Sequence, residues 1–87
     1  MSLDTTLNAL SDKTRREILN MLKDSPKSAG ELGDYFDMAP ATLSYHLSKL
    51  LEADLISVKK DKNYRIYSLN TSIFEDLISF LMKFKED

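Results

Sequence analysis

Cysteine is absent from this sequence of 87 residues, and histidine occurs once, as His46. Disulfide bonds, thiolate metal sites and cysteine nucleophiles are therefore excluded. A single histidine also falls short of the about four ligands that a structural zinc site needs. We expect neither a bound metal ion nor another cofactor.

Glycine and proline are scarce, with two residues of each, so the chain has little room for long loops. No apolar run approaches the ~20 residues of a transmembrane helix. The first residues, 1–4, lack the basic and then apolar pattern of a signal peptide. We therefore expect a cytoplasmic protein without stable membrane insertion.

A catalytic constellation is missing as well. The sequence contains no Gly-rich phosphate loop and no convergent pair of carboxylates. Its composition, with 43% hydrophobic and 30% charged residues, is that of an ordinary globular protein. We predict a single domain, residues 1–87, that is not an enzyme.

The net charge of −2 argues mildly against a nucleic-acid partner, because phosphate binding requires lysine and arginine. The charge is unevenly distributed, however. Residues 39–69 hold five basic and three acidic residues and so carry +2, which leaves −4 for the other segments. A basic stretch on an acidic body can present one positive face, and an ordinary mixed surface is the alternative.

Apolar periodicity predicts two helices in the first part of the chain. Leucines at helical spacing indicate a short helix over residues 4–10. A second helix follows Ser11 or Asp12, either of which can serve as its N-cap, and runs to about Lys23.

Capping boxes at residues 28–31 and 72–75 predict the starts of two further helices. The last of these continues to about residue 85. In the helix that begins near residue 28, three side chains are expected to face inward: Leu32, Tyr35 and Phe36.

Residues 55–58 and 64–69 are rich in β-branched and aromatic side chains and predict two strands. The polar residues 61–63 form the tip between them, where Asn63 tolerates a positive φ better than most residues. The expected fold is mainly α with a small β-hairpin, an α+β arrangement.

The helix that begins at Pro40 and continues to about Ala53 has two contrasting faces. Its apolar stripe, which predicts anchoring to a core, consists of Leu43, Leu47 and Leu50. The opposite face carries small and hydrogen-bonding side chains, which allow close approach to base edges in the major groove of DNA. These outward residues are Ala41, Thr42, Ser44 and Tyr45.

His46 falls at the edge of the apolar stripe of this helix, and two interpretations stay open. In one, the ring has a structural role and bonds to backbone or phosphate. In the other, it contacts a base or a phosphate of DNA.

Several successive segments resemble the ArsR-type winged helix-turn-helix repressors of bacteria. Residues 10–19 are similar to the family's opening ALSDPTRREIL pattern. Residues 44–50 resemble its S-x-H-L-x-x-L recognition-helix signature, and residues 52–56 and 66–70 resemble the entry to and exit from its wing. The match covers nearly the whole chain in order and is closest to the SdpR-like autorepressor subgroup.

The resemblance implies a homodimer that binds palindromic, double-stranded operator DNA through a winged helix-turn-helix. His46 then joins the four outward residues of the recognition helix as a DNA contact. The implied contacts of the wing are Lys59, Lys60, Lys62 and Arg65.

The chain also departs from the family pattern. Lys13 replaces a usual proline, and Asp54 replaces a glycine. Residues 31–36 lack the cysteine pair with which family members sense soft metals. The last helix has no histidine, and Glu75 and Asp76 alone suit only hard cations. We therefore reject metal sensing as the main hypothesis.

The apolar arc of the last helix spans roughly 200°, which is wider than one core requires. In a monomer the excess would stay exposed and would favour association. The alternative is a helix buried on both sides within one subunit. The expected interface residues are Leu3, Leu7, Phe74, Leu77, Ile78, Leu81 and Met82.

The sequence thus predicts a dimeric, sequence-specific transcriptional repressor, and the resemblance makes it an autorepressor. The alternative is a winged-helix protein-interaction module that is regulated by a sequestering protein partner rather than by metal. The acidic net charge favours this alternative.

Overall fold

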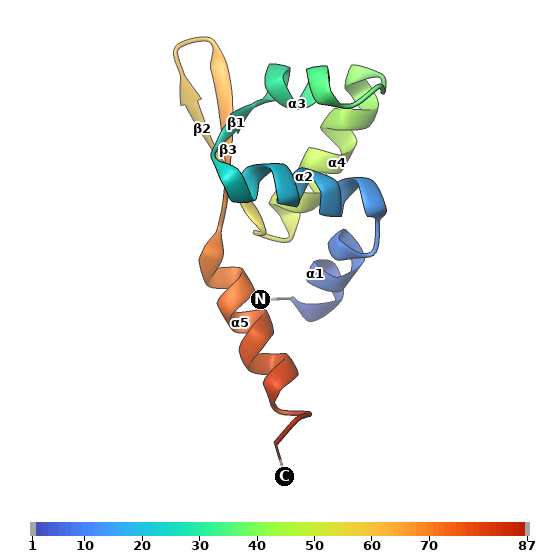
Figure 1. Cartoon of the computed structure of the whole chain (residues 1–87), viewed down its shortest axis with the longest axis vertical. Helices are drawn as coiled ribbons and strands as arrows, with labels where there is room; N and C mark the ends of the chain where they lie inside the picture. Colours follow the sequence, from blue (N-terminus) through green and yellow to red (C-terminus); the bar gives the residue numbers. More distant parts are fainter. Residues whose placement is uncertain (1, 87) are drawn as a thin grey trace.

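Five helices and three short strands make up residues 2–86, the part of the chain that the computed structural model describes (Figure 1). The first and last residues of the predicted 1–87 domain lie outside the described residues. The predicted mainly α fold with a β-hairpin is confirmed. The elements are α1 (Leu3–Leu10), α2 (Lys13–Asp24), β1 (Lys27–Ser28), α3 (Ala29–Tyr35), α4 (Pro40–Glu52), β2 (Ile56–Asp61), β3 (Tyr64–Leu69) and α5 (Thr71–Met82).

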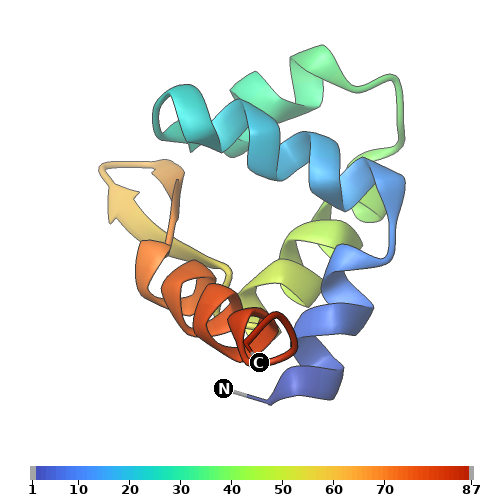
Figure 2. The same ribbon diagram turned by 60° about the horizontal axis from the view of Figure 1, so that its bottom comes forward.

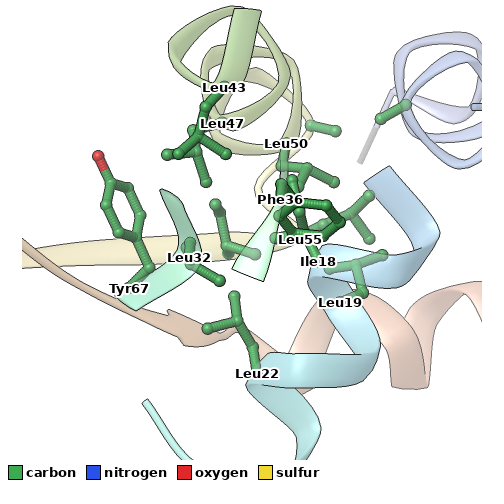
Figure 3. Close-up of a cluster of buried hydrophobic side chains, with 13 residues drawn as sticks. Ile18, Leu19, Leu22, Leu32, Phe36, Leu43, Leu47, Leu50, Leu55 and Tyr67 are labelled. Atoms are coloured by element: carbon green, nitrogen blue, oxygen red, sulfur yellow. The ribbon is translucent and has the colours of Figure 1, made fainter. Parts of the chain in front are cut away.

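The core lies where α2, α3, α4 and the sheet meet (Figure 3). Ile18 of α2, Leu32 of α3 and Leu50 of α4 are fully excluded from solvent, as is Leu55 just before β2. Burying a side chain of this size is worth about 1.5–3 kcal/mol. All three leucines of the predicted α4 stripe are buried, so that prediction is confirmed and α4 is anchored along one face.

The sequence does not predict β1. Lys27 and Ser28 pair antiparallel with Tyr67 and Ile66 of β3, and the strand order is β1-β3-β2. Two residues are too few to display the alternation of a strand. Ser28 is also the N-cap of α3, so the segment resembles a helix start rather than a strand.

The hairpin β2–β3 forms a wing whose strands stay in continuous antiparallel register. β2 runs to Asp61, beyond the predicted end at residue 58. Lys62, and not Asn63, has the positive φ, at 57°. The left-handed position is thus the first of the two loop residues, as in a type II′ turn, and not the asparagine that tolerates it better than most.

The end of α4 leads directly into the wing. The Leu55 amide donates to the Leu50 carbonyl at 3.1 Å, and the Asp54 amide donates to the Leu51 carbonyl at 3.0 Å. This pair of bonds is the Schellman pattern of helix termination, which requires a left-handed residue. Asp54 supplies it with a φ of 56°, a conformation that glycine would adopt at lower cost.

Two of the predicted N-caps are confirmed. The Asp12 carboxylate accepts a hydrogen bond from the Arg15 amide at 3.0 Å and begins α2. In the capping box of α3, the Ser28 hydroxyl accepts from the Glu31 amide at 3.1 Å, and the Glu31 carboxylate accepts from the Ser28 amide at 3.0 Å. Each cap satisfies amides that the helix itself leaves unpaired.

The capping box predicted at Ser72 and Glu75 is wrong. α5 begins at Thr71, two residues earlier than this box predicts, with Asn70 as an N-cap that makes no side-chain capping bond. The Ser72 hydroxyl donates to the Asn70 side-chain carbonyl at 2.9 Å, and the Asn70 amide group donates to the Asp54 carbonyl at 2.8 Å. Asn70 therefore links the exit of the wing to its entry instead of capping the helix.

Two further expectations fail at helix ends. Tyr35 is 67% exposed rather than buried, because α3 ends there and the ring meets Phe36 edge-on, with the ring centroids 5.0 Å apart. α5 ends at Met82 rather than near residue 85, since the chain continues in turns.

α5 gives the molecule its elongated shape, with extents of 49 × 23 × 21 Å. α1 and α5 lie at one end of the molecule, away from the tip of the wing and from α3 (Figures 1 and 2). Leu77 of α5 is buried, and Ile73 and Phe74 pack against the core. Within residues 2–86, no helix has both the length and the apolar character needed to cross a membrane.

The N-cap at Asp12 makes the free energy of unfolding depend on pH. The hydrogen bond from the Arg15 amide, aided by the charges of His46 and Arg15, lowers the pKa of the Asp12 carboxyl. Because folding lowers this pKa, the ionised carboxylate stabilises the fold above its unfolded pKa of about 3.9. That contribution is lost as the pH falls through the folded pKa.

We therefore expect Asp12→Asn to unfold with less dependence on acid than the wild type between about pH 4 and pH 2. Asparagine is an equally good N-cap, so the helix start is retained at neutral pH. Thermal unfolding followed by circular dichroism at several pH values measures this difference. An equal loss of stability in both proteins over that range would contradict the assignment.

Candidate nucleic-acid interface

The outward face of α4 is exposed as the sequence predicts. Ala41, Thr42, Ser44 and Tyr45 are all open to solvent, and Tyr45 is 56% exposed. Pro40 at the first position suits a helix start, because its missing N–H has no partner to lose there. The first turns of α4 therefore present small side chains and hydroxyl groups on a helix whose other face is fixed in the core.

Tyr45 is further held by its neighbours on the same helix. The Lys49 ammonium lies 5.5 Å from the centre of the Tyr45 ring, a distance typical of a cation–π contact. Lys49 also lies 3.7 Å from the Glu52 carboxylate. The positive charge at this end of α4 is thus partly compensated, whereas the first turns carry no acidic residue.

His46 is placed differently from the four outward residues. Its side chain is only 12% exposed, and Nδ1 lies 3.7 Å from the Asp12 carboxylate and 3.4 Å from Nη1 of Arg15. The ring is therefore packed against the start of α2. This contact gives His46 a structural role, one of the two interpretations that the sequence leaves open, but its partners are two side chains rather than backbone or phosphate.

Arg15 is a buried residue that the sequence analysis missed. It is 7% exposed and lies on the buried face of α2 with Ile18, Leu19 and Leu22. The sequence contains a signal for its burial, because these four positions have the spacing of a single stripe along one face of a helix. An arginine on such a stripe has to find hydrogen-bond partners inside the molecule.

The four basic residues predicted in the wing are all exposed, but they do not share one face. Lys60 lies opposite Arg65, and Val58 lies opposite Tyr67, on the face that carries the buried residues. Lys59 lies opposite Ile66 on the reverse face, since side chains alternate along a strand. Lys62 stands at the turn.

Lys60 and Arg65 are like charges directly opposite each other across two strands. Such a pair is destabilising unless an anion lies between or near the two groups. No carboxylate within residues 2–86 forms a salt bridge with either of them. A phosphate placed on this face would relieve the repulsion, whereas Lys59 has Asp61 on its own face.

A hollow of about 540 Å³ connects the wing to α4. Ser44 and Leu47 of α4 line it on one side, and Arg65 and Tyr67 of β3 line it on the other. Residues of α3, including the acidic Asp34, line it as well. One residue from each predicted set, Ser44 and Arg65, is thus brought to the same hollow, although the two are distant in the sequence.

The predicted dimer residues fall into two groups. Leu77 is buried and Phe74 packs on the core of the same subunit, while Leu3 is half-buried. The remaining ones are open to solvent: Leu7 is 46% exposed, Ile78 59%, Leu81 54% and Met82 47%. We call these four residues the α1/α5 apolar surface.

Comparison with known proteins identifies the family. The model of bacterial regulatory proteins of the arsR family matches residues 12–58. The chain is 34% identical to the transcriptional repressor SdpR of Bacillus subtilis, over 94% of this chain and 91% of that protein. It is 38% identical to the arsenical resistance operon repressor of Staphylococcus aureus, over 91% of this chain and 76% of that protein.

Solved structures agree with this assignment. An ArsR family transcriptional regulator superposes with a TM-score of 0.88 at 28% identity, over 95% of this chain and 86% of its own. HlyU from Vibrio cholerae superposes with a TM-score of 0.76 at 27% identity, over 97% of this chain and 97% of its own. The chain therefore belongs to the arsR family of bacterial regulatory proteins.

Proposed function

We propose that this protein is a DNA-binding transcriptional repressor. The first turns of α4 enter the major groove, and the Lys60–Arg65 face of the wing binds the flanking phosphates. The observation that carries the proposal is the shared hollow, because Ser44 and Arg65 border one depression from two different elements. A single duplex can therefore contact both.

The named relatives support regulation of transcription. SdpR and the staphylococcal protein are repressors, and a further relative from Vibrio cholerae, 31% identical over 86% of this chain, is the transcriptional activator HlyU. We propose repression, and specifically repression of the protein's own promoter. A reporter gene fused to that promoter distinguishes the two directions, because a repressor lowers its expression and an activator raises it.

The α1/α5 apolar surface supports assembly as a homodimer. Four large side chains stay exposed on two helices at the end of the molecule away from the wing tip. A twofold axis would bury the same surface on both subunits. Two copies of α4 would then address the two halves of a palindrome, about one helical turn apart.

Regulation by a soft metal at a cysteine site is not available to this chain, since it contains no cysteine. We therefore propose that release from DNA follows a different signal, such as capture by a protein partner. A protein-interaction module without DNA binding is the second candidate function. The net charge of −2 favours it, and a duplex that is not bound at low salt would support it.

The two faces of the wing supply a matched pair of variants. We expect Lys60→Ala to weaken binding of all duplexes and to reduce the slope of log affinity against log salt concentration by about 1. Lys59→Ala removes the same charge from the same strand but on the reverse face, so its effect is smaller. Fluorescence anisotropy over a range of salt concentrations measures both. Equal effects of the two variants would show that the Lys60–Arg65 face is not the one that binds.

Thr42 and Ser44 should determine sequence preference rather than general affinity. We expect Thr42→Ala or Ser44→Ala to lower affinity for a duplex selected by the wild type about fivefold, the equivalent of about 1 kcal/mol for one hydrogen bond. Affinity for a scrambled duplex should change little. The control Ser57→Ala removes an exposed hydroxyl from β2. Unchanged preference in both α4 variants would refute their role in base recognition.

The α1/α5 apolar surface is tested by introducing a charge. We expect Ile78→Asp with Leu81→Asp to give a monomer in sedimentation velocity at concentrations where the wild type is a dimer, because a carboxylate would have to be desolvated in the interface. Ser79→Asp, at an exposed position of the same helix, is the control and keeps the dimer. A dimeric double variant would place the interface elsewhere.

A further inference from the structure

The side chain of Arg15 has no part in the DNA contacts proposed above, yet it is almost completely buried. Arginine is rarely buried to this extent unless its guanidinium group is paired with partners inside the protein. The partners of Arg15 come from two other elements, α1 and α4. Arg15 of α2 therefore connects three helices.

Two of the hydrogen bonds of Arg15 reach the last turn of α1. Nε donates to the Ala9 carbonyl at 2.8 Å, and Nη2 donates to the Asn8 carbonyl at 3.0 Å. Carbonyls at a helix end lack partners within the helix, and the negative end of the helix dipole favours a cation there. The guanidinium group thus fixes the end of α1 to the start of α2.

The third arm of the guanidinium group reaches α4. Nη1 lies 3.4 Å from Nδ1 of His46. A guanidinium has no acceptor, so Nδ1 accepts this bond and the histidine carries its proton on Nε2. The Asp12 carboxylate lies 3.7 Å from the same nitrogen. A carboxylate bonds only to a protonated ring nitrogen, so in this tautomer Arg15, and not Asp12, is the residue of α2 that holds the imidazole ring.

We propose that Arg15 is a positioning residue, which sets the first turns of α4 relative to α1 through Nδ1 of His46. The proposal rests on the proposed DNA-binding function, because the helix that Arg15 positions is the one proposed to enter the groove. In the sequence of α4, His46 lies between the exposed Tyr45 and the buried Leu47. α1 also carries Leu7 of the α1/α5 apolar surface. One buried side chain then connects the helix of the dimer surface with the helix that enters the DNA groove.

Two substitutions of His46 distinguish positioning from direct contact with DNA. His46→Asn places an acceptor where Nδ1 stands, whereas His46→Gln places its amide group where Nε2 stands. We expect His46→Asn to bind a fluorescein-labelled duplex, selected from a random library by the wild type, with nearly unchanged affinity. His46→Gln should lose about tenfold, as for loss of a hydrogen bond to a charged group.

The opposite result, in which His46→Gln binds well and His46→Asn does not, would overturn the proposal and make His46 a DNA contact through Nε2. Arg15→Met, which removes all three arms, should also lose at least about tenfold in affinity while remaining a dimer in sedimentation. Wild-type affinity of a folded Arg15→Met protein would overturn the proposal as well. The histidine pair decides the question even where Arg15→Met does not fold.

Hydrogen exchange of the backbone amides of Thr42 to Ser44 provides a readout without DNA. We expect faster exchange in His46→Gln and wild-type exchange in His46→Asn, because only the second keeps the bond to Arg15. Equal exchange rates in the two variants would refute positioning. If the wild type binds no duplex but the exchange rates differ as expected, the proposed function fails and the positioning role stands.

Discussion

The burial of one face of α4 is the constraint on which the rest of the structure depends. Leu43, Leu47 and Leu50 are held against Ile18 and Leu32, and side chains so packed have little freedom to shift. The opposite face can then remain polar and exposed without loss of order. A helix with polar groups on all sides would have no such anchor, and its hydroxyl groups could not be presented in a fixed arrangement.

The distribution of charge distinguishes the wing from the rest of the chain. The chain is acidic overall, but the wing places Lys60 and Arg65 side by side across the two strands. This repulsion is a local cost in the free protein, and it marks the face where an anion would be most stabilising. Acidic residues act at a helix start instead. The hydrogen bond from the Ser28 amide lowers the pKa of the Glu31 carboxyl, and this favours the charged form of Glu31 at the start of α3.

Much of the fold and of the candidate site could be predicted from the sequence, because the information was local. Periodicity located the leucine stripe of α4, and the residues Asp12, Ser28 and Glu31 located two helix starts. Features that depend on distant partners could not be predicted. β1 exists only because Tyr67 and Ile66 lie beside it, and Asn70 is diverted from capping by the Asp54 carbonyl. The division of the wing lysines between two faces likewise requires the register of the hairpin, which no single strand reveals.

The left-handed turn at Asp54 has a consequence for how such proteins can diverge. Leu55 is bound to Leu50 on one side and, through its carbonyl, to the Asn70 amide on the other, at 3.0 Å, so the base of the wing is fastened to the end of α4. Among residues 2–86, no hydrogen bond of this kind attaches the tip at Lys62 to the body. Residues can therefore be inserted at the tip to lengthen the reach of the wing. A single insertion at the corner would instead exchange the inner and outer sides of the whole β2 strand and turn Lys60 away from α4.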